Sequence, residues 1–305
     1  MHAPLANSVR LAPRRHSALR LLAFRAAEWS VAACGGRRIY QARHLTAKGV
    51  RVREERVLVP DLAPGLEGLS IAQLSDLHGG RFLGRGDLRG VVERVNALAP
   101  DLVVVTGDWI THAWSEALPL LDDLAELRAP LGCFAVFGNH DYKGRLEGRI
   151  ADAARARGVR FLRNQHARLE RRGSTFVLTG LEDPEEARAV DLEEARAGVD
   201  PRDLEIVLCH NPLAAPRIAR VGCALILAGH SHGTQVDLPF LRRLGPAHPG
   251  LRLRFGRTTL LVSRGLGVVG VPWRVGAPAE VVLARFERGV EAVSGANGGV
   301  ACTAR

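Results

Sequence analysis

The chain has 305 residues, of which 47% are hydrophobic, and a formal net charge of +10. This length and composition can form a full hydrophobic core, and we expect one main α/β domain preceded by an N-terminal extension. The five cysteines are an odd number without C-x-x-C spacing. They argue against a disulfide framework and a structural zinc site, and favour reduced thiols in a cytoplasmic protein.

The positive charge is concentrated at the N-terminus. Residues 1–50 hold nine basic side chains and one acid, Glu28, a net charge of +8 that leaves +2 for residues 51–305. We therefore predict a basic arm over residues 1–56 that contacts an anionic membrane surface; the alternative is a solvated, partly disordered tail. No basic face interleaved with aromatic residues follows, so we expect no nucleic-acid partner.

The most hydrophobic part of this arm is ALRLLAFRAAEWSVAACGG, residues 18–36. Arg20, Arg25 and Glu28 interrupt this segment, and the chain has no continuous apolar run of the roughly 18 residues typical of a transmembrane helix. The arginines are spread around a helical wheel, unlike those of a regular amphipathic helix. We expect a cytoplasmic, peripheral membrane protein, with export or anchoring through residues 14–36 as the alternative.

A regular alternation of strands and helices begins at about residue 57. Apolar strands are predicted over residues 69–76, 101–109 and 132–141, and helices over residues 86–100 and 115–128. Strands that alternate with helices in this way are typical of an α/β layered fold.

The second half of the chain is richer in strands. Strands are predicted in segments 160–181 (short strands with a turn at Arg172-Gly173), 203–212, 223–233, 251–265 (a hairpin) and 279–288. The change from helix-rich to strand-rich sequence predicts two packed sheets with helices outside. Residues 291–305 are rich in Gly and Ala, and we expect them to form a disordered tail.

Five of the predicted strands end in short polar motifs. They are SDLH (75–78), GDW (107–109), GNHD (138–141), CHNP (209–212) and GHSH (229–232). Because strand ends can converge at one edge of a sheet, these motifs can bring carboxylate, amide and imidazole groups together. This donor set lacks a thiolate and favours Mn²⁺, Fe or Zn²⁺ in higher coordination. Its size suits two ions that share a bridging carboxylate, an arrangement used in phosphoryl transfer.

In this order the motifs resemble those of the calcineurin-like metallophosphoesterase superfamily, over about residues 69–235. The segment SRGLGVVGVPWRVGAPAEV (263–281) is similar to the closing segment of a bacterial subgroup. That subgroup contains membrane-associated phosphodiesterases, including UDP-diacylglucosamine pyrophosphatases of lipid A synthesis. The resemblance implies a four-layer α/β/β/α sandwich of two mixed sheets with outer helices, and a catalytic domain over residues 57–290.

The resemblance also implies a role for each motif residue. The implied metal ligands are Asp76, His78 and His232 for a first ion, Asn139, His210 and His230 for a second, and Asp108 as the bridge. His140 would stabilise or protonate the leaving oxygen, and Asp141 would orient His140.

Several residues near the motifs have more than one interpretation. Gly229 and Gly233 would let the backbone pass close to the ions without a side-chain clash. Thr234 stands where glycine is common in the subgroup, and it would narrow the substrate groove. His112 either touches the substrate or is an exposed residue before a helix. Arg264 either meets a phosphate or forms a salt bridge at a strand end.

The leading interpretation is a hydrolase of phosphodiester or pyrophosphate bonds that uses two divalent ions, Mn²⁺ above Fe or Zn²⁺. The expected substrate is lipid-linked, such as UDP-diacylglucosamine. One alternative is a soluble phosphodiesterase for nucleotides or cyclic nucleotides. Another, of a different class, is a non-catalytic scaffold, which would have lost ligands or His140; none is missing here.

Overall fold

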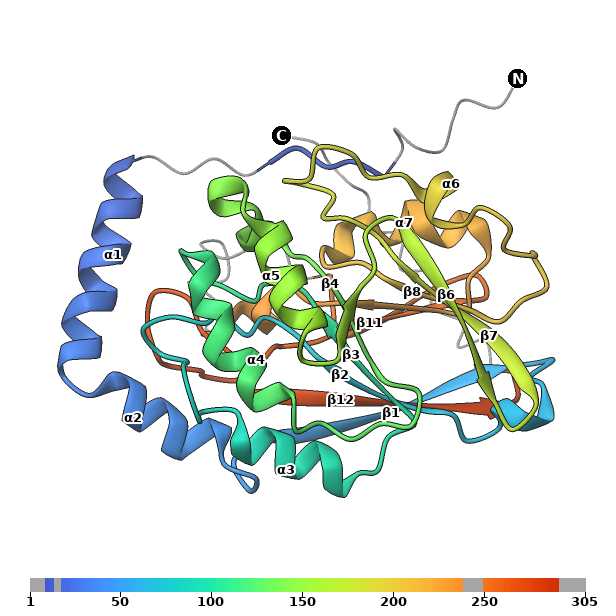
Figure 1. Ribbon diagram of the computed structural model, residues 1–305, viewed down its shortest axis with the longest axis horizontal. Coiled ribbons are helices and arrows are strands. Elements are labelled where there is room, and N and C mark those ends of the chain that lie inside the picture. The colour runs from blue at the N-terminus through green and yellow to red at the C-terminus, as the bar shows by residue number, and fades with distance from the viewer. Residues whose placement is uncertain (1–8, 14–17, 238–248, 291–305) are drawn as a thin grey trace.

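The computed structural model describes residues 9–13, 18–237 and 249–290. This part of the chain forms two six-stranded mixed sheets that pack against each other, with helices on their outer sides (Figure 1). The predicted four-layer α/β/β/α architecture is therefore confirmed. The tail expected over residues 291–305 lies outside the described residues.

The first sheet is built around four parallel strands. Its order is β1 (Arg51–Val59), β12 (Glu280–Arg288), β2 (Ser70–Leu74), β3 (Leu102–Thr106), β4 (Cys133–Val136) and β5 (Val159–Phe161). Strands β2 to β5 run parallel to one another, whereas β12 is antiparallel to β2 and parallel to β1. The carboxyl ends of β2, β3 and β4 therefore lie at one edge of the sheet.

The second sheet also has a parallel centre, with an antiparallel hairpin at each side. Its order is β10 (Arg252–Phe255), β11 (Thr258–Val262), β9 (Leu225–Ala228), β8 (Glu205–Leu208), β7 (Ser174–Gly180) and β6 (Gln165–Arg171). Strands β7, β8, β9 and β11 are parallel, and the hairpins are β6–β7 and β10–β11. The turn at Arg172 and Gly173 is present, and both residues adopt positive φ angles.

The side-chain alternation of the strands separates two apolar regions. Ile71 of β2 and Val104 of β3 face the second sheet, where they pack in one cluster with residues such as Leu208 and Leu227. Their neighbours Ala72 and Val103 belong to a second cluster, which includes the helices outside the sheets. Because side chains alternate across a strand, strands that are apolar at every position require cover on both faces.

Three helices cover the outer face of the first sheet. They are α3 (Arg89–Ala97), α4 (Leu118–Leu124) and α5 (Glu147–Arg155). The helix predicted over residues 115–128 begins with the 3₁₀ turn η4 (Trp114–Ala117) and continues as α4. Helix α5 was not predicted. The second sheet carries the shorter helices α6 (Leu192–Ala195) and α7 (Ala215–Ile218), the latter between 3₁₀ turns η6 (Pro212–Ala214) and η7 (Ala219–Val221).

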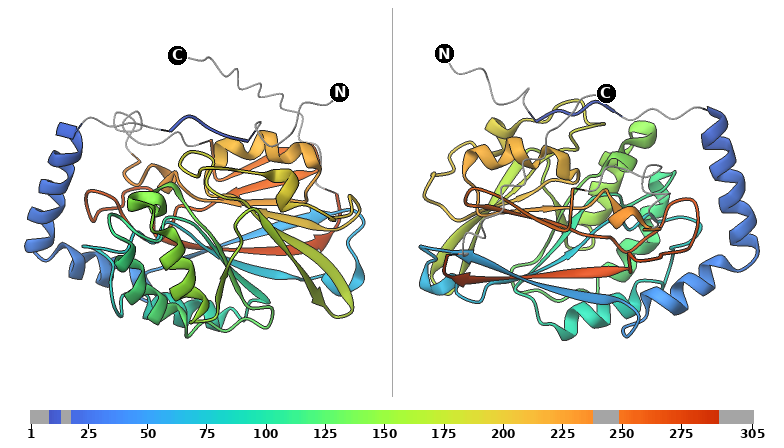
Figure 2. Two further views of the ribbon diagram at one scale, coloured as in Figure 1. Left: turned by 45° about the horizontal axis from the view of Figure 1, so that its top comes forward. Right: turned by 180° about the vertical axis from the view of Figure 1, so that it is seen from behind.

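The N-terminal segment divides into a peripheral helix and a packed part. Helix α1 (Ala18–Ala33) lies at one end of the molecule, outside the sheets, in every view (Figures 1 and 2). Helix α2 (Gly36–Tyr40) and the π-helical turn η2 (Gln41–Leu45) follow, and Tyr40, Leu45 and Val50 are buried in the core. Strand β1 then forms an edge of the first sheet. Residues 51–56, the last of the predicted arm, therefore belong to the folded domain.

Two further findings concern this segment. Strand β1 was not predicted, because its sequence, RVREERVLV, is rich in charged residues. An edge strand tolerates such residues, since one of its sides faces water. Among the helices of the described residues, none combines the length and the apolar character needed to cross a bilayer.

Candidate metal centre

The predicted ligands come together at the carboxyl ends of the strands of both sheets. Asp76 and His78 follow β2, Asp108 follows β3, and Asn139 begins the 3₁₀ turn η5 (Asn139–Arg145) after β4. His210 follows β8, and His230 and His232 follow β9. The loops are joined through their backbones, because Asp76 N–H donates to Gly107 O at 3.0 Å and Gly229 N–H donates to His210 O at 2.9 Å.

The first group contains Asp76, His78, Asp108 and His232. One potential ligand atom from each lies within 4.8 Å of all the others, and all four residues are buried. His78 Nε2 and His232 Nε2 are 2.9 Å apart, and His232 Nε2 is 3.4 Å from Asp76 Oδ1. Imidazole nitrogens and carboxylate oxygens therefore face a common point.

The second group contains Asn139, His210 and His230. Asn139 Oδ1 lies 3.0 Å from His230 Nδ1, and the rings of His210 and His230 are 5.2 Å apart, edge to face. Asp108 Oδ2 lies between the two groups, at 3.4 Å from His78 Nε2 and 3.3 Å from His210 Nε2. This is the position expected of a bridging carboxylate.

His210 shows that the centre suits a cation. Its Nδ1 lies 2.7 Å from Thr106 O, and a carbonyl only accepts, so the Nδ1 proton is used there. In the neutral ring the lone pair is then on the buried Nε2, which faces Asp108 Oδ2 at 3.3 Å without a hydrogen bond to it or to another described residue. A backbone carbonyl on the other ring nitrogen is the usual arrangement behind a metal-bound histidine.

The pKa values in the centre also reflect its buried charges. Burial raises the pKa of Asp76 to about 6, although nearby His210 acts in the opposite direction. Burial also acts to raise the pKa of Asp108, but its interaction with the neighbouring imidazoles, above all that of His210, outweighs burial and holds this pKa well below its usual range. Desolvation lowers the pKa of His78 to about 4, which keeps its imidazole neutral, as a metal ligand must be.

Five of these residues adopt an uncommon backbone conformation. Asp76, His78, Asp108, His230 and His232 have φ angles of 50°, 47°, 55°, 67° and 52°. Left-handed residues other than glycine cost of order 1–3 kcal/mol each and persist only where the surroundings enforce them. Their concentration at the strand ends indicates that the loops are shaped for the side chains they present.

Glycines allow the loops to approach one another. A Cβ atom at Gly229 would overlap the carboxylate of Asp76, and one at Gly138 would overlap Asp108 Oδ1. At Gly233, which has a φ of 55°, a Cβ atom would lie 2.8 Å from the Arg264 side chain. The close approach predicted for Gly229 is therefore present, and it involves a metal ligand directly.

The segment that carries the ligand motifs matches a known protein family. Residues 69–234 match the profile of the calcineurin-like phosphoesterase family. The chain belongs to this family. It is 32% identical over 252 residues to an uncharacterized metallophosphoesterase of Aquifex aeolicus, an alignment that covers 79% of this chain and 93% of that protein. The buried Asp and His side chains are thus the metal site of a metallophosphoesterase domain.

Two other relatives carry more specific names. A Danio rerio protein, "Transmembrane protein with metallophosphoesterase domain", is 31% identical over 77% of this chain. The chain spans only 57% of the length of that relative. The UDP-2,3-diacylglucosamine pyrophosphatase LpxG of Chlamydia trachomatis is 29% identical, over 65% of this chain and 74% of its own length.

His140 of the phosphoesterase site is oriented by a residue that was not predicted. Lys143 Nζ lies 2.6 Å from His140 Nδ1 and donates to Thr111 O, also at 2.6 Å. Thr111 O also lies 3.3 Å from Nδ1, but the ammonium group is closer and only donates, so Nδ1 accepts from Lys143 and the neutral ring carries its proton on Nε2. Desolvation lowers the pKa of His140 to about 3, even though Asp108 acts in the opposite direction.

Asp141 was expected to orient His140, and the structure corrects this expectation. Its Oδ1 accepts from the backbone N–H groups of Trp109 and Ile110 at 2.8 and 3.2 Å, and its Oδ2 accepts from Gly138 N–H at 2.8 Å. Asp141 therefore ties the loop after β3 to the turn that carries Asn139 and His140. The sequence signal for Lys143 is only its spacing of three residues from His140 in a tight turn.

Arg274 is a second residue of the site that sequence reasoning missed. It is buried, and its guanidinium donates to the backbone carbonyls of Arg264 and Ala277 at 2.9 and 3.1 Å. Its Nε donates to Tyr40 Oη at 3.0 Å, and its Nη2 lies 3.5 Å from His232 Nδ1. Tyr40, from the N-terminal segment, is thus linked through Arg274 to a predicted metal ligand.

The residues with two interpretations are also placed. Arg264 pairs with Glu280 at 2.6 Å, which is the salt-bridge alternative. His112 Nε2 lies 2.8 Å from Glu28 Oε2 of helix α1. Thr234 has a φ of 69°, and its hydroxyl donates to Asp237 at 3.2 Å.

The position of Asp108 leads to a test of metal binding. Wild-type protein should bind about two divalent ions per chain, as two-metal hydrolases do. Asp108→Ala should lose both ions, because its carboxylate faces both ligand groups. Metal content after Mn²⁺ loading and desalting is measured by elemental analysis, with the exposed Asp61→Ala as control. Full metal content in Asp108→Ala would contradict the bridging assignment.

The approach of Gly229 to Asp76 leads to a second test. Gly229→Ala should weaken metal binding, because the added methyl group would overlap both Ser75 Oγ and the Asp76 carboxylate and displace them. Titration with Mn²⁺ should show a fall in affinity of about 10–100-fold, the effect typical of disturbing a ligand's support. Gly148→Ala is the matched control, since a Cβ atom there meets open space. Equal affinity in the two variants would show that the loop can move aside.

The contact of Lys143 with His140 leads to a third test. Lys143→Met should keep its metals but lose turnover, by less than the roughly 10²–10⁴-fold that general acid–base catalysis contributes. The loss should be greatest for substrates with poor leaving groups, because their leaving oxygens develop the most negative charge and depend most on the hydrogen bond from His140. Lys143→Arg should restore part of the rate. A loss that is equal for good and poor leaving groups would exclude this orienting role.

Proposed function

We propose that this chain hydrolyses phosphodiester or pyrophosphate bonds in a lipid-linked substrate, with UDP-diacylglucosamine as the leading candidate. One observation carries the chemistry: the buried Asp108 carboxylate lies within 3.4 Å of an imidazole nitrogen from each of two ligand groups, where the strand ends of the two sheets meet. The lipid-linked class is supported by the similarity to the pyrophosphatase LpxG, at 29% identity. The identity of the metal is part of the proposal, with Mn²⁺ preferred.

In this proposal the residues keep the roles assigned to them above. Asp76, His78 and His232 hold one ion. Asn139, His210 and His230 hold the other, and Asp108 is shared. When bound, the two ions supply charge neutralisation for the phosphoryl oxygens and an activated water as nucleophile.

The chain itself supplies a hydrogen-bond donor for the leaving oxygen. His140 lies beside the first group, with its ring 4.7 Å from that of His78 and edge to face with it. Its backbone N–H donates to Asp108 Oδ1 at 2.9 Å, so the position of the imidazole is tied to the bridging carboxylate. With its proton on Nε2, the neutral His140 ring is placed to stabilise the charge on a leaving oxygen at the edge of the centre by donating a hydrogen bond.

A substrate panel tests the proposed function. Mn²⁺-loaded protein is assayed with UDP-diacylglucosamine, an aryl phosphodiester, an aryl phosphomonoester and cyclic nucleotides, with Asp108→Ala as the control for contaminating activity. We expect the highest kcat/KM for UDP-diacylglucosamine and weaker hydrolysis of the aryl diester.

The other outcomes distinguish the alternatives. A preference for cyclic nucleotides would replace the lipid-linked substrate with the soluble phosphodiesterase function. Absence of Asp108-dependent hydrolysis of every substrate would contradict the enzymatic proposal as a whole.

A further inference from the structure

Exposed apolar side chains gather at one end of the molecule. Eight large hydrophobic residues of the described part are exposed, and five of them belong to α1, α2 and the loop before β12. These five are Leu22 (65% exposed), Trp29 (61%), Ile39 (58%), Trp273 (57%) and Val275 (47%). We call α1, α2, η2 and residues 272–275 the docking face. Concentrated apolar exposure of this kind is typical of an interaction surface.

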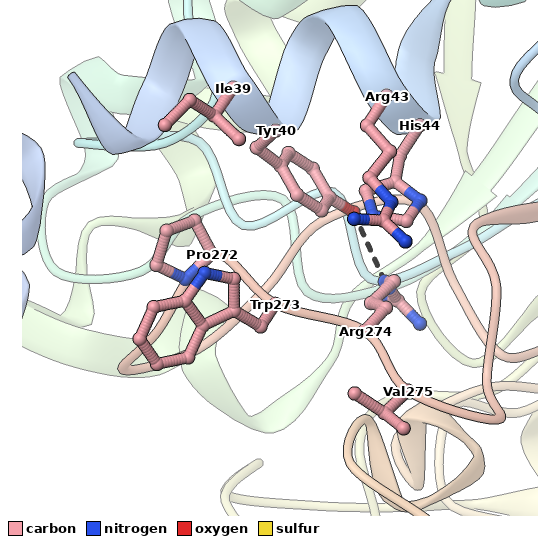
Figure 3. Close-up of a pocket in the computed structure, with 8 residues that line it drawn as sticks. All are labelled: Ile39, Tyr40, Arg43, His44, Pro272, Trp273, Arg274 and Val275. Atoms are coloured by element: carbon pink, nitrogen blue, oxygen red, sulfur yellow. Dashed lines mark hydrogen bonds between the residues drawn. The ribbon is translucent and has the colours of Figure 1, made fainter.

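Direct contacts join the segments of the docking face. Figure 3 shows Ile39 of α2 above Pro272 and Trp273 at one end of a pocket, which Arg43 and Val275 also line. Glu28 of α1 accepts a hydrogen bond from Gly270 N–H at 3.2 Å. Leu22 and Trp29 are seven residues apart on α1, so they lie on the same side of that helix. The five apolar side chains thus belong to neighbouring elements.

The charges of the docking face are positive. Within the described part of the chain, no carboxylate pairs with the exposed Arg25, Arg38 or Arg43. The one acid of these segments, Glu28, is buried and faces His112 at 2.8 Å. Arg43 lines the same pocket as Trp273, and the guanidinium of Arg81 stacks 3.5 Å above the Trp29 ring. Guanidinium groups beside exposed indole rings suit a lipid surface, which is anionic at its headgroups and apolar below them.

The docking face also borders the metal centre. Arg274 lies between the exposed Trp273 and Val275, but its own side chain points inward, where Nη2 is 3.5 Å from His232 Nδ1. At the other side, His112 connects α1 to the loop of Thr111, whose carbonyl accepts from Lys143. A surface that covers the docking face therefore lies beside the catalytic groups.

We propose that the docking face binds the surface of an anionic lipid bilayer. The arginines contact lipid phosphates, and Leu22, Trp29, Ile39, Trp273 and Val275 enter the interfacial layer. The membrane contact expected from the basic sequence is thereby extended from an N-terminal arm to a folded face that includes the loop before β12. This binding does not depend on the proposed hydrolysis, and it is measured without substrate.

The test compares two double variants of the full chain that carry the same change of charge. Leu22→Glu/Ile39→Glu alters the docking face, and Leu146→Glu/Leu213→Glu alters two exposed residues elsewhere. Each is mixed with phosphatidylglycerol vesicles and with phosphatidylcholine vesicles, and the bound fraction is measured by flotation. Circular dichroism and hydrolysis of a soluble aryl phosphodiester report folding and the metal centre separately.

We expect the wild type and the Leu146→Glu/Leu213→Glu variant to float with the anionic vesicles and less with the neutral ones. The affinity of the docking-face variant for anionic vesicles should fall about tenfold or more. Two apolar side chains no longer enter the bilayer, and the two new glutamates are repelled by the anionic lipid. Fluorescence of the wild type should shift to shorter wavelength on binding, as exposed indoles leave water. Equal loss in both variants, no loss in either, or no binding by the wild type would overturn the proposal.

Discussion

The carboxylate of Asp108 sets the geometry on which the centre depends. It is buried at the end of β3, and its Oδ2 lies within 3.4 Å of an imidazole nitrogen from each sheet, that of His78 and that of His210. A buried carboxylate is unfavourable unless charges or hydrogen-bond donors compensate it. The loops that follow the strands of both sheets must therefore place an imidazole next to this oxygen. This requirement limits how the two sheets can be positioned against each other.

The apolar layer between the sheets supplies that alignment. Side chains such as Ile71, Val104, Leu208 and Leu227 come from strands that lead directly into the ligand loops. Because protein interiors are packed densely and deform little, this layer keeps the two edges in a fixed relation. The same rigidity maintains the left-handed conformations of the ligand residues, which an isolated loop would not adopt.

The N-terminal segment is part of this construction. Tyr40, the last residue of α2, is buried and accepts a hydrogen bond from Arg274, which in turn reaches His232. Glu28 connects α1 to His112 and to the loop at Gly270. The elements of the docking face are thus held by contacts that also reach residues of the metal centre.

The amino-acid sequence by itself determined the layered fold and the motifs of the site. Apolar strands and the polar residues that end them are local patterns, and parallel strands place their ends at one edge whatever else the chain does. Only the tertiary structure revealed that β1 pairs with β12, because a charged edge strand has no local apolar pattern. It also assigned Lys143 to His140, Asp141 to backbone N–H groups, and Arg274 to His232. Those contacts depend on the conformations of loops that tight packing brings together, and residue spacing along the chain does not encode them.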